Sequence, residues 1–431
     1  MRQMAVDVAV VGGGPAGLAA GITASREGAS ALILERSQEL GGVLVQCVHS
    51  GFGLKLYGED LTGPEYAWRW LDNLGDLRYL TDTMVIAIEP GFTPRKIRRL
   101  FRVTASSGGL GVVSVQARAL VLAMGCRERT RGAIAIPGTR PAGIMTAGTA
   151  QRLVNIHGYM PGRRIVILGS GDIGMIMARR LAWEGAQVAG VYELMPYLSG
   201  LRRNYVQCLA DYGIPLHLSH TVTDIRGVKR LTSVAVSPVD DGLRPILRDS
   251  FDVGADTLLL SIGLIPENEL TRLTGATMAA DTGGPLVDNR MQTSISGMFA
   301  AGNVVHVHDL ADDVSLAGQL AGAEAARYAL GQGDSEGVGR LRVLAGENVR
   351  LVAPQALRMD DLETRELELQ LRVRRPIEAR CLVEFLVAGA RVGSLRLDYA
   401  RPGEMVSVKV SRKVAGALAG GGDLIIGVVA A

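Results

Sequence analysis

Residues 6–35 have the sequence VDVAVVGGGPAGLAAGITASREGASALILE, and this stretch decides how the chain begins to fold. Its β-branched start predicts a buried parallel strand, and a G-x-G-x-x-G loop, Gly12–Gly17, follows at once. Small residues at 18–26 predict a helix, and the apolar run 30–34 predicts a second strand that leads to Glu35. Strand, glycine loop, helix, strand and acid together predict a dinucleotide-binding βαβ unit.

Each part of this unit has a physical role in binding a dinucleotide. Gly12 permits the tight turn, Gly14 lets backbone N–H groups approach a pyrophosphate, and Gly17 lets helix and strand pack closely. The helix N-terminus offers unpaired N–H donors to the anion. Glu35 lies 23 residues after Gly12, where a carboxylate can accept hydrogen bonds from ribose hydroxyls. The alternative, a glycine-rich turn without a ligand, would not need all these parts in register.

The same pattern recurs in the middle of the chain. Arg164–Leu168 predict a strand, Gly169–Gly174 form the loop, and Met175–Glu184 predict the helix. A second predicted strand, Gln187–Tyr192, leads to Glu193, which lies 24 residues after the first glycine of its loop. Two copies of one βαβ unit predict two bound dinucleotides, or one dinucleotide and a degenerate partner.

A third pair of segments supports the repeat. Residues 119–125 and 257–263 are both apolar strands that end in a small residue, any residue and a glycine, each downstream of its own glycine-rich loop. In the second copy, Glu193 favours NADH, because a carboxylate repels a 2′-phosphate. Arg202 and Arg203 lie further on and would serve NADPH instead.

Composition excludes several classes of function. The net charge of +3 argues against a dedicated nucleic-acid binder. No uninterrupted apolar run approaches the ~18 residues of a membrane-spanning helix, so we expect a cytoplasmic chain without a transmembrane segment. No C-x-x-C motif is present, so an iron–sulfur site, a zinc knuckle or a redox dithiol is not expected within the chain. The cysteines are Cys47, Cys126, Cys208 and Cys381.

The segment Thr293–Asn303 carries a further signature. It matches the pattern T-x5-F-[AG]-x-G-D, except that Asn303 replaces the usual Asp. Over about residues 5–332 the chain resembles the two-dinucleotide-binding flavoproteins, such as glutathione reductase, thioredoxin reductase and NADH oxidase. This resemblance implies an α/β fold in which a Rossmann-like domain for NAD, or else NADP, is inserted into a Rossmann-like domain for FAD.

Three stretches carry a closer likeness: Gly41–Gly53, Gly125–Arg129 and Gly302–Leu310. They resemble a prokaryotic subgroup that accompanies a separate glycerol-3-phosphate-dehydrogenase-like or amino-acid-oxidising flavoprotein, as in opine oxidase, hydrogen cyanide synthase and dye-linked proline dehydrogenases. The resemblance implies a homo-oligomer or a subunit of a complex with a second flavoprotein dehydrogenase. Any iron–sulfur centre would have to lie on a partner, such as a small Cys-rich protein.

The expected domains follow from these motifs and from composition. Residues 1–140 and 283–333 should form the FAD domain, and 141–282 the NAD(P) domain. A Gly-rich boundary at 331–335 precedes a region, 338–431, whose alternating apolar and polar residues predict an antiparallel β domain. Either docking or dimerisation, or simple capping of the core, would explain this last domain.

The residues predicted to bind the two dinucleotides share a place in a glycine loop, at a strand end or beside a signature acid. In the flavin half they are Gly12, Gly14, Pro15, Ala16, Gly17, Glu35, Arg36, Gly42, Gly125, Gly302 and Asn303; in the nicotinamide half they are Gly169, Gly171, Asp172, Ile173, Gly174, Glu193 and Gly263.

Three side chains are candidates for chemistry: Cys47, His49 and His306. The resemblance places Cys47 on a helix beside the flavin ring, where single-Cys relatives use a sulfenate or mixed disulfide; the alternative is a small packing residue. His49, His306 and His308 would flank the flavin as acids or bases, with the last two pointing opposite ways if their segment is extended. Nearby acids suggest loop charge or capping, and no metal is predicted.

The leading hypothesis is an NADH-linked flavin oxidoreductase that exchanges electrons with a partner dehydrogenase or a small acceptor. A helix over 314–330 would stabilise negative charge on the reduced flavin with its N-terminus. One alternative is a complex subunit whose nicotinamide site is vestigial. Another is a stand-alone NADH oxidase or peroxidase that uses Cys47.

Overall fold

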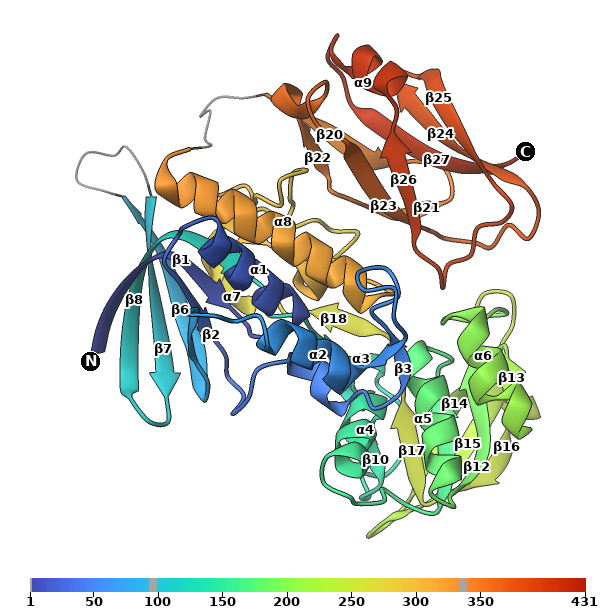
Figure 1. The fold of residues 1–431 in the computed structure, drawn as a ribbon. Coiled ribbons are helices and arrows are strands. Elements are labelled where there is room, and N and C mark those ends of the chain that lie inside the picture. The colour runs from blue at the N-terminus through green and yellow to red at the C-terminus, as the bar shows by residue number, and fades with distance from the viewer. Residues whose placement is uncertain (1, 93–98, 333–338) are drawn as a thin grey trace. The chain divides into compact units, whose positions relative to one another are not determined.

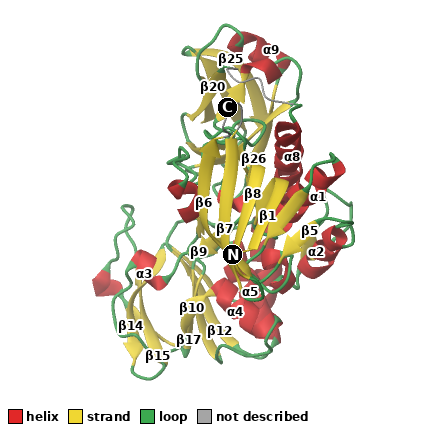
Figure 2. Ribbon diagram, turned by 90° about the vertical axis from the view of Figure 1, so that its left-hand side faces the viewer, coloured by secondary structure: helices red, strands yellow, loops and turns green. Residues whose placement is uncertain are grey.

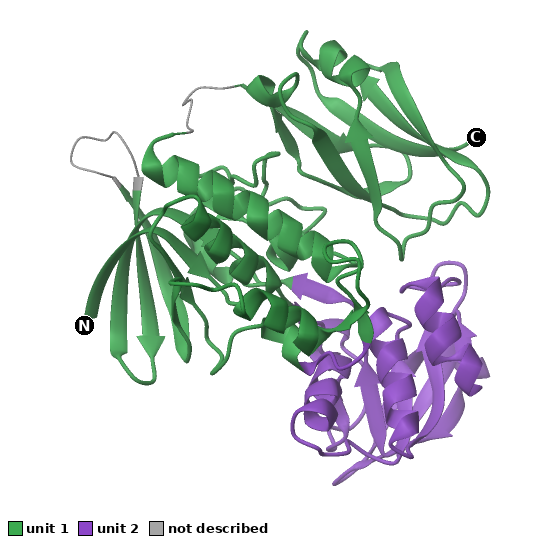
Figure 3. Ribbon diagram, viewed as in Figure 1, with its two compact units in different colours: residues 1–45, 50–126, 266–431 green, residues 46–49, 127–265 purple. Residues whose placement is uncertain are grey.

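The computed structural model divides the chain into two compact units, drawn in different colours in Figure 3. Its described residues are 2–92, 99–332 and 339–431. The expected boundary at 331–335 lies partly outside the described residues, and the expected domain limits stay a prediction. The first unit comprises Met1–Val45, Ser50–Cys126 and Pro266–Ala431, and the second comprises Gln46–His49 and Arg127–Ile265.

A seven-stranded sheet forms the centre of the first unit, in the order β5-β2-β1-β8-β7-β6, with β19 beside β8. Figure 1 labels β1, β2, β6, β7 and β8 of this sheet, and Figure 2 also labels β5. Strands β5, β2, β1, β8 and β19 run parallel, whereas β6, β7 and β8 are antiparallel. The strands are β1 (Arg2–Val11), β2 (Ala31–Leu34), β5 (Arg78–Leu80), β6 (Thr83–Phe92), β7 (Arg99–Ser107), β8 (Gly111–Leu122) and β19 (Met298–Ala300).

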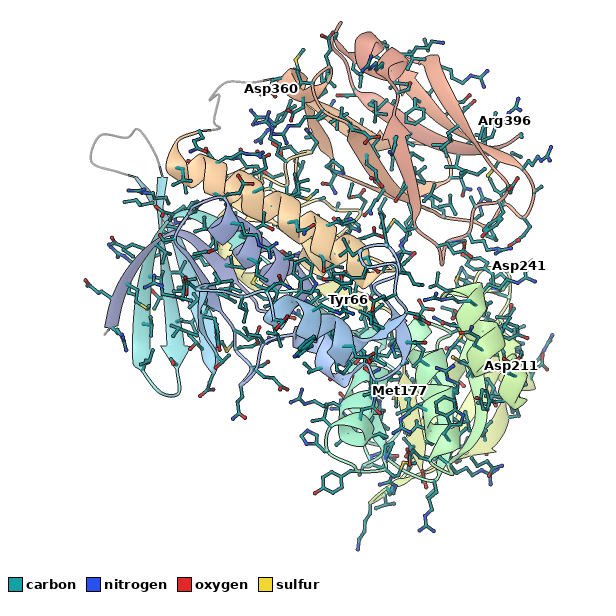
Figure 4. All side chains as sticks on the ribbon, viewed as in Figure 1. Tyr66, Met177, Asp211, Asp241, Asp360 and Arg396 are labelled. Carbon is teal, nitrogen blue, oxygen red and sulfur yellow. The ribbon has the colours of Figure 1, made fainter. Side chains whose placement is uncertain are left out.

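Both faces of this sheet are buried. Val8 and Val10 of β1 belong to one hydrophobic cluster, and Ala9 and Val11 belong to the other. Helices α1 (Pro15–Arg26), α2 (Gly63–Leu71) and α8 (Ala311–Leu330) pack in the first cluster. The hydroxyl of Tyr66 on α2 (labelled in Figure 4) donates to Ser315 Oγ on α8 at 2.8 Å. Burial on two faces explains the continuous apolar runs.

The second unit is built on a parallel sheet in the order β10-β17-β11-β12-β13, with an antiparallel meander β14-β15-β16. Its sheet strands are β10 (Ile144–Thr146), β11 (Arg164–Leu168), β12 (Gln187–Glu193), β13 (Leu216–Leu218) and β17 (Thr257–Leu260); the meander consists of β14 (His220–Gly227), β15 (Leu231–Pro238) and β16 (Phe251–Gly254). Its helices are α3 (Arg131–Ile134), α4 (Ala147–Asn155), α5 (Asp172–Trp183) and α6 (Arg202–Cys208).

The C-terminal region is a β structure, as predicted, and belongs to the first unit. Its strand pairs are antiparallel as expected except for one, residues 343–345 with 424–426, which is parallel. Two sheets, β22-β20-β27-β24-β25 and β21-β23-β26, share one hydrophobic core. The elements are β20 (Arg340–Ala345), β21 (Val349–Ala353), β22 (Ala356–Arg358), β23 (Leu367–Val373), β24 (Cys381–Val387), β25 (Ala390–Leu397), β26 (Val406–Val410), α9 (Arg412–Leu418) and β27 (Leu424–Ala430).

The remaining helices and strands are short. They are β3 (Ser50–Phe52), β4 (Leu61–Thr62), β9 (Cys126–Glu128), β18 (Leu264–Pro266) and α7 (Glu269–Leu273), with 3-10 turns η1 (Gly42–Gln46), η2 (Ala210–Tyr212), η3 (Leu247–Asp249), η4 (Gly302–Val304) and η5 (Met359–Asp361). Within the described ranges, no helix combines the length and the apolar character needed to cross a membrane.

Two predicted elements differ from the structure. The sequence predicts a strand over 119–125, but β8 starts earlier and runs unbroken from Gly111 to Leu122. One side of it pairs with β7 and the other with β1, so tertiary pairing carries the strand across its polar residues. Helix α8 begins at Ala311 rather than at residue 314, which places Asp312 and Asp313 in its first turn.

Candidate functional site

The first glycine loop forms a tight cradle between β1 and α1. Gly12 has a φ of +105°, and a Cβ on it would lie 2.4 Å from the carbonyl oxygen of Ala123. A Cβ on Gly17 would lie 1.8 Å from the carbonyl oxygen of Gly12. Helix α1 starts at Pro15 with no side chain capping its N-terminus. The loop therefore leaves backbone N–H donors at the start of α1 without a side-chain cap, a geometry that suits an anion.

Glu35 is anchored at the end of β2. Its side chain is buried, and its Oε2 accepts a hydrogen bond from the Gly13 N–H at 2.7 Å. Its Oε1 accepts from the Ser37 N–H, also at 2.7 Å. A carboxylate offers about four acceptor positions. The two backbone bonds thus fix its orientation and leave acceptor positions for ribose hydroxyls.

The second glycine loop repeats this geometry contact by contact. Gly169 has a φ of +95°, and a Cβ on it would lie 2.1 Å from the carbonyl oxygen of Ser261. Glu193 is buried and accepts from the Ser170 N–H at 2.8 Å and from the Met195 N–H at 2.9 Å. The repeat inferred from the sequence therefore extends to individual hydrogen bonds.

The two cradles differ at the residue after the first glycine. Gly13 has no side chain, whereas the Ser170 hydroxyl donates a third hydrogen bond to Glu193 Oε2 at 2.7 Å. The same hydroxyl accepts from the Ser199 N–H at 3.0 Å. Fewer acceptor positions of Glu193 therefore remain for a ribose than on Glu35.

Asp172, predicted to bind cofactor, uses its side chain within the protein. Its Oδ1 accepts from the Leu201 N–H at 2.8 Å and from Asn204 Nδ2 at 2.6 Å. These bonds tie the start of α6 to the start of α5. Arg202 and Arg203 are exposed on the first turn of α6.

A second pair of glycines closes the two cradles. Gly42 lies seven residues after Glu35, and a Cβ on it would lie 2.9 Å from the Gly14 Cα. Gly200 lies seven residues after Glu193, and a Cβ on it would lie 2.8 Å from the Asp172 nitrogen. Gly42 was predicted at the flavin site, whereas Gly200 was not predicted. The equal spacing from each acid is the signal that identifies it.

Asn303 gathers several predicted residues in the first unit. Its Oδ1 accepts from the His308 N–H at 3.0 Å and lies 3.2 Å from His308 Nδ1. Its Nδ2 donates to Cys126 Sγ at 3.6 Å. Gly302, just before it, would bring a Cβ within 3.0 Å of the Ala16 side chain. Asn303 therefore lies beside the start of α1.

His306 and His308 do not point opposite ways, because the segment between them is turned rather than extended. Their rings stack with centroids 4.0 Å apart. Burial lowers the pKa of His306 to about 4 and lowers the pKa of His308 well below its usual value. Both imidazoles are therefore neutral near pH 7, and neither supplies a proton as an imidazolium.

Cys47 and His49 belong to the second unit by their contacts. Cys47 follows the 3-10 turn η1, not a helix as expected, and its thiol lies 3.8 Å from Gln151 Oε1. Burial raises the pKa of Cys47 to about 12. The thiolate is the reactive form, so this environment does not favour thiol chemistry.

The two acids in the first turn of α8 both have partners within the protein. Asp312 accepts from the backbone N–H groups of Gly53 and Leu56, each at 3.2 Å, and Asp313 pairs with Lys55 at 2.6 Å. These carboxylates offset the positive end of α8 that we expected to face the flavin. The described residues contain no cluster suited to a metal ion.

Arg36 and Gly125 were also predicted at the flavin site, and both contact Glu267. Arg36 is exposed and pairs with Glu267 at 3.4 Å. The Glu267 N–H donates to the Gly125 carbonyl at 3.0 Å. In the second unit, the N–H of Arg129 donates to the Gly263 carbonyl at 3.0 Å, and Ile173 is half-buried on the first turn of α5.

Two curated relatives are each similar over about two thirds of the chain. Hydrogen cyanide synthase subunit HcnB of Pseudomonas aeruginosa is 30% identical over 290 residues, which cover 62% of this chain and 58% of that protein. An opine oxidase subunit of Agrobacterium tumefaciens is 24% identical over 316 residues, covering 69% and 61%. The chain thus spans about six tenths of the length of these relatives.

Solved structures and a family model agree on the fold. T. acidophilum thioredoxin reductase has a TM-score of 0.61 at 22% identity, covering 76% of this chain and 99% of that one. The family model described as pyridine nucleotide-disulphide oxidoreductase matches residues 6–333. The fold class is therefore confirmed, with two Rossmann-type domains and a C-terminal β region. This chain belongs to the pyridine nucleotide-disulphide oxidoreductase family.

Proposed function

We propose that this chain binds FAD in its first unit and NADH in its second, and exchanges electrons with a partner dehydrogenase or a small acceptor. The observation that carries this proposal is the duplicated cradle, in which Glu35 and Glu193 are held by equivalent backbone donors. Two such cradles suit two dinucleotides, and the match of both to one family favours one flavin and one nicotinamide.

The flavin half fits FAD by its own geometry. The uncapped start of α1 and the backbone of Gly12–Gly17 would hold the pyrophosphate, and Glu35 would orient the ribose. The amide of Asn303 would form a hydrogen bond with the ribityl chain or the pyrophosphate of FAD. When bound, the flavin supplies the ability to take a hydride from a nicotinamide and pass electrons on. The protein binds and orients the cofactor and supplies the electrostatic environment around it.

Glu193 supports NADH rather than NADPH. Its carboxylate ends β12, where it would repel a 2′-phosphate. Arg202 and Arg203 are exposed and are seated on α6, whose start is held by Asp172. A preference for NADH follows from this arrangement of charges.

Transfer to a partner or acceptor is favoured over thiol chemistry. The sequence has no C-x-x-C, and the pKa of Cys47 is raised to about 12. Several similar proteins are named as subunits of larger enzymes, among them those of hydrogen cyanide synthase and opine oxidase. The proposal that this chain also works as part of a complex rests on that likeness.

A vestigial nicotinamide site is the second candidate function. Its support is the Ser170 hydroxyl, which occupies an acceptor position of Glu193 that Gly13 leaves open on Glu35. In that case the chain would bind FAD and relay electrons without binding NADH.

Acceptor specificity tests the proposed function. The purified chain, with NADH, should reduce a redox dye at a steady rate and should leave an aromatic disulfide untouched. The variant C47S should behave like the wild type in both assays. Rapid disulfide reduction that C47S abolishes would contradict electron transfer without a thiol. When this chain is purified at its native expression level, a flavoprotein partner should copurify with it.

A further inference from the structure

The C-terminal region holds the loop of residues 305–310, which links Asn303 to helix α8. Arg372 on β23 donates to the Val307 carbonyl at 3.3 Å and makes an ion pair with Asp309. The other oxygen of Asp309 accepts from the Met405 N–H at 2.6 Å. Both members of the ion pair are nearly buried, with side-chain exposures of 10% and 13%. The loop is therefore clamped by a desolvated, two-sided contact.

The opposite side of the same loop orients Asn303. The backbone N–H of His308 can only donate, so the atom that it meets at 3.0 Å must be the amide oxygen of Asn303. The amide nitrogen then faces Cys126 Sγ at 3.6 Å. The position of His308 thus decides which way the Asn303 amide points.

We propose that Arg372 is a positioning residue for Asn303, and that the C-terminal region thereby sets the affinity of the flavin site. The clamp acts through the 305–310 loop: Arg372 fixes Val307 and Asp309, and His308 between them fixes the amide. This inference rests on the proposed role of Asn303 at the flavin.

The C-terminal region also contacts the flavin half away from this clamp. A separate ionic network joins the region to the flavin half: Arg290 pairs with Asp361 at 2.6 Å and with Asp360 at 3.1 Å, and Arg365 pairs with Glu324 of α8 at 2.8 Å. Asp360 is labelled in Figure 4. A buried ion pair is costly to form, so a second one on the 305–310 loop suits a role in fixing that loop.

Flavin affinity tests the proposal directly. Apo-protein is reconstituted with FAD, and the dissociation constant is measured by flavin fluorescence. R372M should weaken FAD binding about ten-fold, because it leaves Asp309 without its cation and frees the loop. The control is R391M: Arg391 pairs with Glu384 at 2.6 Å within the C-terminal region, has no part in the clamp, and should leave FAD affinity unchanged.

A double-variant cycle separates positioning from general destabilisation. If Arg372 acts through Asn303, R372M should add little to the loss caused by N303A, and the visible absorption bands of bound flavin should shift alike in both single variants. Fully additive losses, or an effect of R372M equal to that of R391M, would overturn the proposal. Should R372M fail to fold, D309N and R372K carry the test, and unchanged FAD affinity in both would overturn it.

Two outcomes distinguish the role of Asn303 from that of the clamp. If N303A binds FAD like the wild type, then the proposed role of Asn303 is wrong, and the route from Arg372 falls with it. If N303A weakens FAD binding but R372M does not, then only the clamp is wrong, and Asn303 keeps its place at the flavin.

Discussion

The hydroxyl of Ser170 donates a hydrogen bond to the carboxylate of Glu193, in a position where the flavin half has only Gly13. The two cradles otherwise share their backbone contacts, so this one bond is a built-in difference between two sites of common design. The bond between Ser170 and Glu193 should affect how tightly the second site would bind a ribose.

Ser170→Gly should make the second cradle like the first. The substitution frees an acceptor position on Glu193, and we expect NADH to bind several-fold more tightly, in line with the ~0.5–1.5 kcal/mol of one net hydrogen bond. The dissociation constant from NADH fluorescence checks this. Weaker binding would mean that the Ser170 hydroxyl supports the site rather than competing for its acid.

Replacement of each acid should affect one cofactor only. Glu35→Ala should weaken FAD binding ~10- to 100-fold, because a hydrogen-bonding partner of the ribose and of the Gly13 N–H is lost. Glu193→Ala should weaken NADH binding to a similar degree and leave FAD bound. Flavin content and NADH titration distinguish the two variants, and each serves as the control for the other. Loss of FAD from the Glu193 variant would contradict separate sites.

Cys47 should be unreactive in the folded protein. Its pKa is raised to about 12 by burial, so the thiolate fraction near pH 8 is very small. Alkylation should be far slower than after unfolding, and C47S should keep full turnover with NADH. Mass spectrometry of the labelled residue provides the measurement. Fast labelling of Cys47 in the native chain would show that the thiol is open and ionised.

The buried imidazole of His306 should make stability depend on pH. Its folded pKa is about 4, below the ordinary value of 6.5, so the unfolded chain binds more protons between these values. The free energy of unfolding should therefore fall as pH decreases through this window, by up to ~3 kcal/mol for this group. Denaturant unfolding at about pH 5 and about pH 7 measures it.

The control for this pH dependence is a second histidine substitution. His306→Gln should flatten the fall in stability toward acid pH, whereas His157→Gln should not, because His157 is exposed. Equal slopes for the two variants would show that His306 is not the group that titrates.

Much of the fold follows from the sequence because its signals are local. The glycine loops, the apolar strands and the acids lie within about 24 residues of one another, and the βαβ geometry is set by short-range sterics. Both glycine-loop βαβ units and the β strands of the C-terminal region could therefore be predicted. The full extent of β8 was not predicted, because its pairing with β1 and β7 is non-local.

The side chains of the site were harder to predict because their partners are distant in sequence. Asp172 was expected to face a cofactor, but it meets Leu201 and Asn204 some thirty residues later. His306 and His308 stack because their loop is turned, which alternation along a strand cannot show. The clamp between Arg372 and Asp309 spans two regions that the sequence treats as separate domains.

Anaerobic reduction of the flavin is the most direct test of two dinucleotide sites that work together. The purified, FAD-loaded chain is mixed with NADH in the absence of oxygen, and the visible flavin absorbance is followed in a stopped-flow instrument. We predict rapid bleaching that Glu193→Ala slows at limiting NADH. A flavin that stays oxidised with NADH and NADPH, yet is reduced by dithionite, would contradict the account.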